Sequence, residues 1–294
     1  MNSMIPVDLE VMERRNLSAN FKTVFRSIFT SLTLIQNIRV VAPALGYMFL
    51  QLAVMILYLW SLEKPWTSFW ALFLGGVGAG DVARFPAHLL LMQPILGRVD
   101  MLLGAFVQVI FQASTVCLVS AAFRRKTVSI REATAESIRR YPKLLFVSLL
   151  SSALVYAFIN LARHLSENMD GVARMGTAGS GVLVALAVQT LFLFSIPIIM
   201  HRETPAARIV PESFRAVAEL PIASAIIVIV SFLITLPTTF LSLKAAMIAL
   251  QLSPDFMIHS HIASTIMEMT ANYLLMAGAT IIFIHKIDVR RERD

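Results

Sequence analysis

The chain has 294 residues, of which 57% are hydrophobic and 15% are charged, and its formal net charge at pH 7 is +7. Soluble domains carry about 25% charged residues, so this composition excludes an ordinary soluble protein and indicates a polytopic membrane protein. The positive charge does not predict nucleic-acid binding, because most basic residues lie at the ends of apolar stretches, where they set topology. The single cysteine, Cys117, excludes an intramolecular disulfide and a thiolate metal cluster.

Six apolar stretches follow one another along the chain, each of about the length that crosses a bilayer. They are residues 40–62, 101–123, 144–161, 182–200, 222–243 and 262–284. Before them, apolar residues recur at three- and four-residue steps from Leu17 to Ile38, which predicts an amphipathic helix at the membrane surface. We therefore expect an all-α bundle of six transmembrane helices. Its parts are a cytoplasmic amphipathic N-terminal segment (1–39), a membrane domain (40–286) and a cytoplasmic basic tail (287–294).

The connection between the first two stretches, residues 63–100, contains two short apolar pieces. These are FWALFLGGVGAG (69–80) and PAHLLLMQPIL (86–96), separated by a polar break at residues 81–84. Neither piece is long enough to span alone, so together they predict a re-entrant hairpin or two helices lying on the outer surface. His88 in the second piece is the one candidate for binding a haem or chlorin, although a lone histidine on an apolar segment more often packs through hydrogen bonds.

A basic connector, residues 124–143, separates the second and third stretches. Its seven Lys and Arg residues include Arg124, Arg125, Lys126 and Arg139. Ser129 followed by Glu132 predicts a capping box, and hence a short amphipathic helix that forms an elbow on the membrane surface. With the N-terminus inside, 19 of the 25 basic residues lie on the inner side. This bias predicts a multi-pass protein of the inner membrane with both termini in the cytoplasm.

The second inner connector, residues 201–221, repeats part of the first. Glu136-Ser137-Ile138-Arg139 matches Glu212-Ser213-Phe214-Arg215, and a proline and then a span follow each of them. Pro211 is expected to open the second elbow helix in its first turn. With a diverged third elbow in residues 21–39, the match predicts a unit of elbow, span, outer loop and span that is used three times.

The run from Pro197 through Glu203 and Pro205 to Arg215 resembles a large group of six-span prokaryotic membrane proteins. That group includes the membrane domain fused to some glycerophosphodiester phosphodiesterases. The sequence departs from the group's pattern in Ala206-Ala207-Arg208 and in Pro211. We expect no phosphodiesterase catalytic domain here, so the resemblance implies an architecture and no activity.

Polar side chains inside the apolar stretches are the main candidates for a functional site, because such groups are costly in lipid and should face the bundle interior. They are Gln108, Gln112, Asn160, Gln189, Glu268 and Asn272. Glu268 is expected near the outer end of its span, with Lys244 as a plausible ion-pair partner. It can serve an ion or substrate path, or form an interfacial salt bridge, and the glutamines can equally hold helices together.

These observations leave three functions open. We favour a non-catalytic scaffold or accessory subunit of a membrane complex, because no convincing polar path is visible in the sequence. Its partners would be other membrane-protein subunits and the anionic headgroups of the cytoplasmic face. We expect no binding of nucleic acid. The alternative is a small-solute or lipid transporter, or a permease component, whose polar path involves Glu268, as the repeated hairpins and proline-interrupted spans suggest.

The third function, a haem- or pigment-binding subunit that uses His88, is the least favoured. We expect no enzymatic activity, since no catalytic motif occurs with usable spacing. We also expect no resident cofactor and no metal site. His259 and His261 form the one close histidine pair, and they supply too few ligands for a metal ion.

Overall fold

The computed structural model describes residues 21–22, 24–60, 87–167, 169–251 and 253–288. Every regular element in this part of the chain is a helix, and six of these helices are long and apolar enough to cross a bilayer. They are Ile38–Trp60, His88–Phe123, Tyr141–Glu167, Gly179–His201, Pro221–Leu241 and Phe256–His285. The prediction of an all-α polytopic bundle is therefore confirmed.

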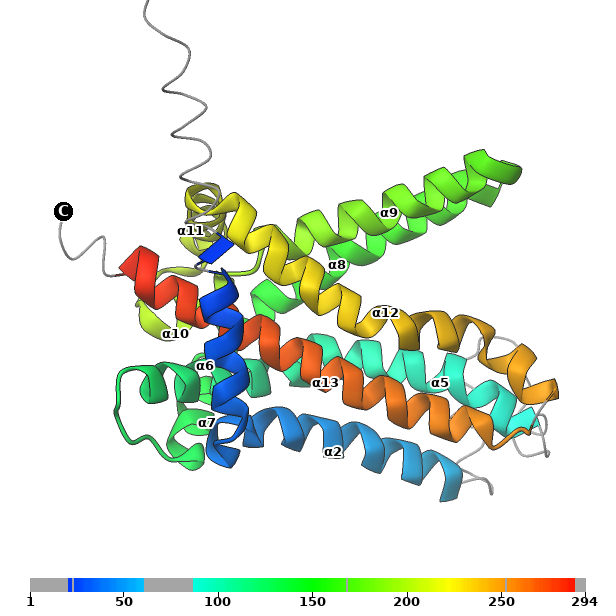
Figure 1. The fold of residues 1–294 in the computed structure, drawn as a ribbon, viewed down its shortest axis with the longest axis horizontal. Coiled ribbons are helices and arrows are strands. Elements are labelled where there is room, and N and C mark those ends of the chain that lie inside the picture. Colours follow the sequence, from blue (N-terminus) through cyan, green and yellow to red (C-terminus); the bar gives the residue numbers. More distant parts are fainter. Residues whose placement is uncertain (1–20, 23, 61–86, 168, 252, 289–294) are drawn as a thin grey trace, which may run out of the picture.

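The first described helix is the short apolar helix Val24–Ile35. The elements after it are α2 (Ile38–Trp60), α5 (Ala87–Leu103), the π-helix η1 (Gly104–Gln108), α6 (Val109–Phe123), α7 (Ile130–Arg139), α8 (Tyr141–Glu167), α9 (Gly171–Leu191), α10 (Ser195–His201), α11 (Ala206–Glu219), α12 (Pro221–Gln251), α13 (Phe256–Ile282) and the π-helix η2 (Phe283–Asp288). Helices α7, α10 and α11 and the helix Val24–Ile35 gather at one end of the bundle (Figure 1). We call this end the elbow end, and the opposite end, where α2 finishes and α5 begins, the loop end.

The second span is longer than the sequence predicted. Helices α5 and α6 and the π-turn η1 between them form one continuous rod over residues 87–123. The prediction of a re-entrant or surface-lying piece is therefore wrong for residues 87–96, and residues 69–80 lie outside the described part. A helix of this length extends roughly 54 Å, well beyond a hydrocarbon core of about 30 Å. Its interior charge, Asp100, consequently belongs to the span and not to a loop.

The hairpins α8–α9 and α12–α13 also extend further than predicted. Residues 162–181, which separate the predicted third and fourth spans, are almost wholly helical, since α8 runs to Glu167 and α9 begins at Gly171. Gly171 has φ +58°, a value that glycine adopts without the steric cost other residues meet. In Figure 1, α8 and α9 lie side by side and diverge from α12 toward their connection. The hairpin tip therefore stands apart from the other spans.

Each elbow helix begins directly after its N-cap residue, which is Ser129 for α7 and Pro205 for α11. The Ser129 hydroxyl accepts a hydrogen bond from the backbone N–H of Glu132 (3.2 Å), and the Glu132 carboxylate accepts one from the N–H of Ser129 (2.8 Å). The predicted capping box is confirmed, and these bonds hold the pKa of Glu132 below its usual range. The prediction for Pro211 is wrong, because Pro205 caps α11 and Pro211 lies inside that helix.

The two matched elbow sequences occupy the same structural setting. Ser137 and Ser213 are both fully buried. The Ser137 hydroxyl lies 3.1 Å from the Ser114 hydroxyl, and Ser213 donates to the carbonyl of Leu191 (2.7 Å), so each serine bonds to the preceding span or its end. The next two residues of each match are exposed. They are Ile138, Arg139, Phe214 and Arg215. The order elbow, span, span thus occurs as α7–α8–α9 and as α11–α12–α13.

Apolar side chains fill the bundle at both ends. The largest cluster lies toward the elbow end and includes Phe194, Ile198 and Phe283. A second cluster joins α2, α5, α12 and α13 toward the loop end and includes Tyr58, Ile95 and Leu96.

Candidate functional site

A cavity of about 360 Å³ lies between the two apolar clusters. Its fourteen lining residues come from α2, α5, η1, α9, α12 and α13, which are parts of five of the six spans. They are Tyr47, Gln51, Gly97, Asp100, Met101, Gln108, Gln189, Ser231, Phe232, Thr235, Glu268, Ala271, Asn272 and Leu275. Most lie near the middle of their spans, so the cavity sits near the centre of the hydrocarbon layer.

Two carboxyl groups from different spans share this cavity. Asp100 comes from α5 and Glu268 from α13, and Gln51 on α2 lines the cavity beside them. One turn before Glu268, the Ser264 hydroxyl donates to its carboxylate (3.1 Å). The lining residues include no Lys, Arg or His. The cavity therefore presents acidic and neutral polar groups and favours positive charge.

Two buried polar atoms of the lining have no partner. Gln51 is 3% exposed and Ser231 is 7% exposed. The Gln51 side-chain oxygen and the Ser231 hydroxyl make no hydrogen bond to any described group. Leaving such a group unsatisfied costs roughly 1–3 kcal/mol, and an unsatisfied group in a native fold calls for an explanation. Both residues line the cavity.

The π-turn η1 sets the direction of one lining residue. Gln108 is the last residue of η1. The carbonyls of Ala105 and Phe106, inside this turn, accept hydrogen bonds from the hydroxyls of Ser148 (2.8 Å) and Tyr141 (3.0 Å) on α8. The extra residue of a π-turn rotates the helical phase of the next residues in the chain by about 100°. The turn is thus part of how the second span directs Gln108 toward the cavity.

The structure brings together most of the polar residues singled out in the sequence. Gln108, Gln189, Glu268 and Asn272 line the cavity. Gln112 joins Gln108 and Asn272 around an adjoining void of about 20 Å³, roughly the size of one water molecule. Asn160 lies elsewhere, on α8, where its amide donates to the carbonyl of Tyr156 on the same helix (2.9 Å).

Glu268 occupies a different position from the one predicted. It lies near the middle of α13 (Phe256–Ile282), not at its outer end. Lys244 is exposed, and no ion pair joins it to Glu268 among the described residues. The expectation of a Glu268–Lys244 salt bridge is therefore wrong, and Glu268 belongs to the cavity.

Sequence reasoning missed five polar lining residues. They are Tyr47, Gln51, Asp100, Ser231 and Thr235. A signal for most of them was present, because polar residues occur in pairs four positions apart within apolar spans. These pairs are Tyr47/Gln51, Ser231/Thr235, Gln108/Gln112 and Glu268/Asn272. Residues at this spacing lie on one helix face, so each pair marks a polar stripe.

The remaining candidates lie away from the cavity. The carbonyl of His88 accepts a hydrogen bond from the Tyr58 hydroxyl (2.6 Å), which joins the start of α5 to the end of α2. At the elbow end, backbone bonds from Arg125 to Ala122 and from Lys126 to Ala121 close α6 in a Schellman motif, with φ 55° at Arg125.

The acidic elbow residues are paired with arginines. Glu136 accepts from Arg139 (3.0 Å), and Arg202 lies 3.5 Å from Glu212.

No group of three or more His, Cys, Asp and Glu side chains among the described residues is arranged to hold a metal ion. No family model, curated protein or solved structure matches this chain. The acidic cavity is therefore the feature from which a function can be inferred, because its two carboxyls and unpartnered polar atoms suit a cationic or hydrogen-bonding ligand.

Proposed function

We propose that this protein is a small-solute or lipid transporter, or a permease component, whose polar path runs through the cavity at Asp100 and Glu268. One observation carries the proposal: two carboxyls from different spans share a mid-span cavity with the unpartnered oxygen of Gln51. Ionisable groups within membrane spans are expensive and mark substrate or ion paths.

The position of the cavity supports the same proposal. Many transporters bind substrate near the bilayer midplane, at the interface of structural repeats, and open alternately to each side. Here the apolar cluster with Phe194 and Phe283 separates the cavity from the elbow end, and the cluster with Tyr58 and Leu96 separates it from the loop end. Movement of a solute across the membrane would require one of these clusters to open at a time.

The scaffold function favoured from the sequence depended on the absence of a polar path. The cavity supplies a polar site within the spans, so transport has the stronger support of the two. The scaffold hypothesis stays a prediction, and a stoichiometric partner that co-purifies from detergent would favour it. The pigment-binding hypothesis also stays a prediction, which a visible absorption band in the purified protein would favour.

We further propose that the elbow end faces the cytoplasm of a cell with this protein in its inner membrane. The distribution of basic residues supports this orientation, and the exposed pairs Ile138/Arg139 and Phe214/Arg215 suit contact with anionic headgroups. A cysteine placed at Lys126, in a Cys117→Ser background, should resist a membrane-impermeant thiol reagent in intact cells. It should react once the membrane is opened, and labelling from outside intact cells would reverse the orientation.

Flux through reconstituted protein tests the transport proposal. Proteoliposomes would be offered a panel of radiolabelled amino acids, sugars and polyamines together with fluorescent phospholipids. The double variant Asp100→Asn/Glu268→Gln should lower the flux of any transported compound at least tenfold, because the acidic groups of the path are removed. The matched control Glu167→Gln/Asp170→Asn, in which two exposed acids at the hairpin tip are neutralised, should keep it. Equal flux in the first variant and the wild type would contradict the proposal.

A further inference from the structure

The cavity opens on one side at mid-span. Three of its lining residues, Gly97 and Met101 on α5 and Gln189 on α9, are exposed, Met101 by 50%. Other lining residues, such as Tyr47 and Gln51, are almost fully buried. An exposed residue that also lines a cavity marks its opening. At this depth the surroundings of the protein are hydrocarbon, so the opening faces the bilayer and not either aqueous side.

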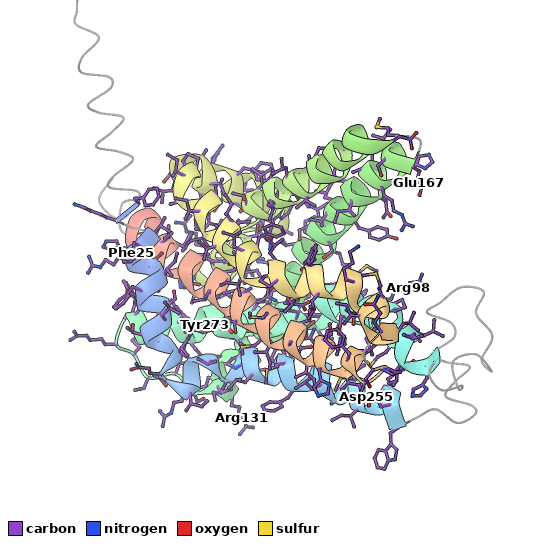
Figure 2. All side chains as sticks on the ribbon, turned by 45° about the vertical axis from the view of Figure 1, so that its right-hand side comes forward. Phe25, Arg98, Arg131, Glu167, Asp255 and Tyr273 are labelled. Carbon is purple, nitrogen blue, oxygen red and sulfur yellow. The ribbon has the colours of Figure 1, made fainter. Side chains whose placement is uncertain are left out.

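The arrangement of the helices explains why the opening lies there. Helix α9 packs against α8, α11 and α12, and α5 packs against α2, α12 and α13. In both views the α8–α9 hairpin diverges from α12 and α5, and Glu167 at its tip lies well apart from Arg98 on α5 (Figures 1 and 2). Helices α5, α9 and α12 all carry exposed apolar side chains. These side chains include Leu102, Leu183, Val184, Leu233 and Leu236.

The inside of the cavity is polar and acidic, whereas its surroundings are mainly apolar. Inside lie two carboxyls, the unpartnered oxygen of Gln51 and the unpartnered hydroxyl of Ser231, with no cationic lining residue. Outside the opening there are apolar side chains and lipid, with the exposed Arg98 directly after the lining residue Gly97. A volume of about 360 Å³ is far larger than a bare ion and equals roughly twelve water molecules at about 30 Å³ each. The space therefore fits a polar group of several heavy atoms.

We propose that the cavity binds the protonated amine headgroup of an amphiphile, which enters sideways between α5 and α9 and leaves its hydrocarbon chain in the bilayer. This inference rests on the transport function proposed above. An ammonium group donates three hydrogen bonds, and Asp100, Glu268 and Gln51 supply acceptors from three different spans. An anionic phosphate headgroup would instead meet two carboxyls and no lysine or arginine.

Photolabelling of the full-length protein in phosphatidylcholine nanodiscs tests the proposal. The probe is a tetradecylamine with a diazirine near the middle of its chain. Labelled peptides should contain the opening residues Met101 and Gln189. Unlabelled dodecylamine should suppress this labelling at a membrane concentration at least tenfold lower than dodecanol or dodecanoate, while ethylamine, which has no chain, should not compete.

Variants separate the headgroup site from the opening. Asp100→Asn/Glu268→Gln should weaken dodecylamine competition at least tenfold, and the control Glu167→Gln/Asp170→Asn should leave it unchanged. Met101→Trp, which adds bulk at an exposed position of the opening, should reduce labelling without lowering the thermal stability of the protein. Equal competition by dodecanol and dodecylamine would overturn the cationic headgroup. Stronger competition by monolaurin would point instead to an uncharged polyol headgroup, and effective ethylamine would overturn the need for a chain.

The outcome for transport can be read separately. If fluorescent long-chain amines bind as described but do not cross proteoliposome membranes, the amine site stands and the transport function fails. If amines show no preference while Asp100→Asn/Glu268→Gln still abolishes the flux of another compound, the transport function stands and the amine headgroup is wrong.

Discussion

The elbow end of the bundle and the α8–α9 hairpin are built in opposite ways. At the elbow end, five of the seven residues of α10 are buried, and Phe194 and Phe283 are completely inaccessible. In the third span, Tyr141–Glu167, only 11% of the residues in its most apolar stretch are buried inside the protein. Elbow helices cover the first region on several sides, whereas the far half of the hairpin has mainly its own two helices as neighbours.

This difference shows where the molecule can open. Regions with few buried apolar contacts open locally at lower free-energy cost than a packed core. The cavity lies where the packed elbow end gives way to the diverging hairpin, and Gln189 of α9 lines it. A change in the tilt of the hairpin would therefore alter access to the cavity while the elbow end stays in place.

Hydrogen bonds as well as apolar contacts hold the elbow end together. Arg140, between α7 and α8, donates to the carbonyls of Ile199 and Arg202 (3.3 Å for the latter) at the end of α10 and to the carboxylate of Glu136 (2.6 Å). Lys143 adds a bond to the carbonyl of Thr204 (2.9 Å). Cations at a helix C-terminus also interact favourably with its dipole. Arg140 thus ties the first elbow to the chain that leads into the second.

The largest effect on stability is expected from Arg140→Met. Its side chain is 19% exposed, so its loss removes one of the two donors of the partly buried Glu136 and a donor to each of two backbone carbonyls. We expect the free energy of unfolding in detergent micelles to fall by about 3 kcal/mol. The matched control is Arg139→Met, because Arg139 pairs with the same Glu136 but is 71% exposed. That variant should change stability by less than about 0.5 kcal/mol, and similar losses in both would show that Arg140 does not fasten the elbow end.

The sequence predicted those features that depend on local pattern. Six apolar spans, the capping box at Ser129 and the paired elbow serines Ser137 and Ser213 all follow from periodicity and short motifs. Asp100 was assigned to a loop because a charge beside Arg98 interrupts the apolar pattern. Whether such a charge ends a span or faces a cavity depends on helices distant in the sequence, such as those that carry Gln51 and Glu268.

The π-turn was unpredictable for the same reason. Two of its carbonyls accept hydrogen bonds from the hydroxyls of Tyr141 and Ser148 on α8. The sequence of residues 104–108 gives no indication of these partners. The acidic cavity was therefore visible in the sequence only as separate polar pairs. Their convergence is a property of the tertiary packing.

A smaller effect, confined to the hairpin, is expected from Gly181→Ala. A methyl group at Gly181 would lie 2.5 Å from the Cβ of Ala162 on α8, so the two helices would have to separate. Overpacking of this kind costs about 1–3 kcal/mol. Gly179→Ala is the control, because its methyl group would meet nothing within 4 Å and should stabilise α9 by roughly 0.5–1 kcal/mol.

Hydrogen exchange followed by mass spectrometry distinguishes a local from a global response. Gly181→Ala should speed exchange in α8 and α9 and leave α10 and α13 protected, because the far half of the hairpin has little other packing to lose. Gly179→Ala should slow exchange in α9 or leave it unchanged. If Gly181→Ala instead accelerated exchange throughout α10, the hairpin and the elbow end would unfold as one cooperative unit. The contrast in packing would then not correspond to a difference in local stability, and hairpin movement would no longer explain access to the cavity.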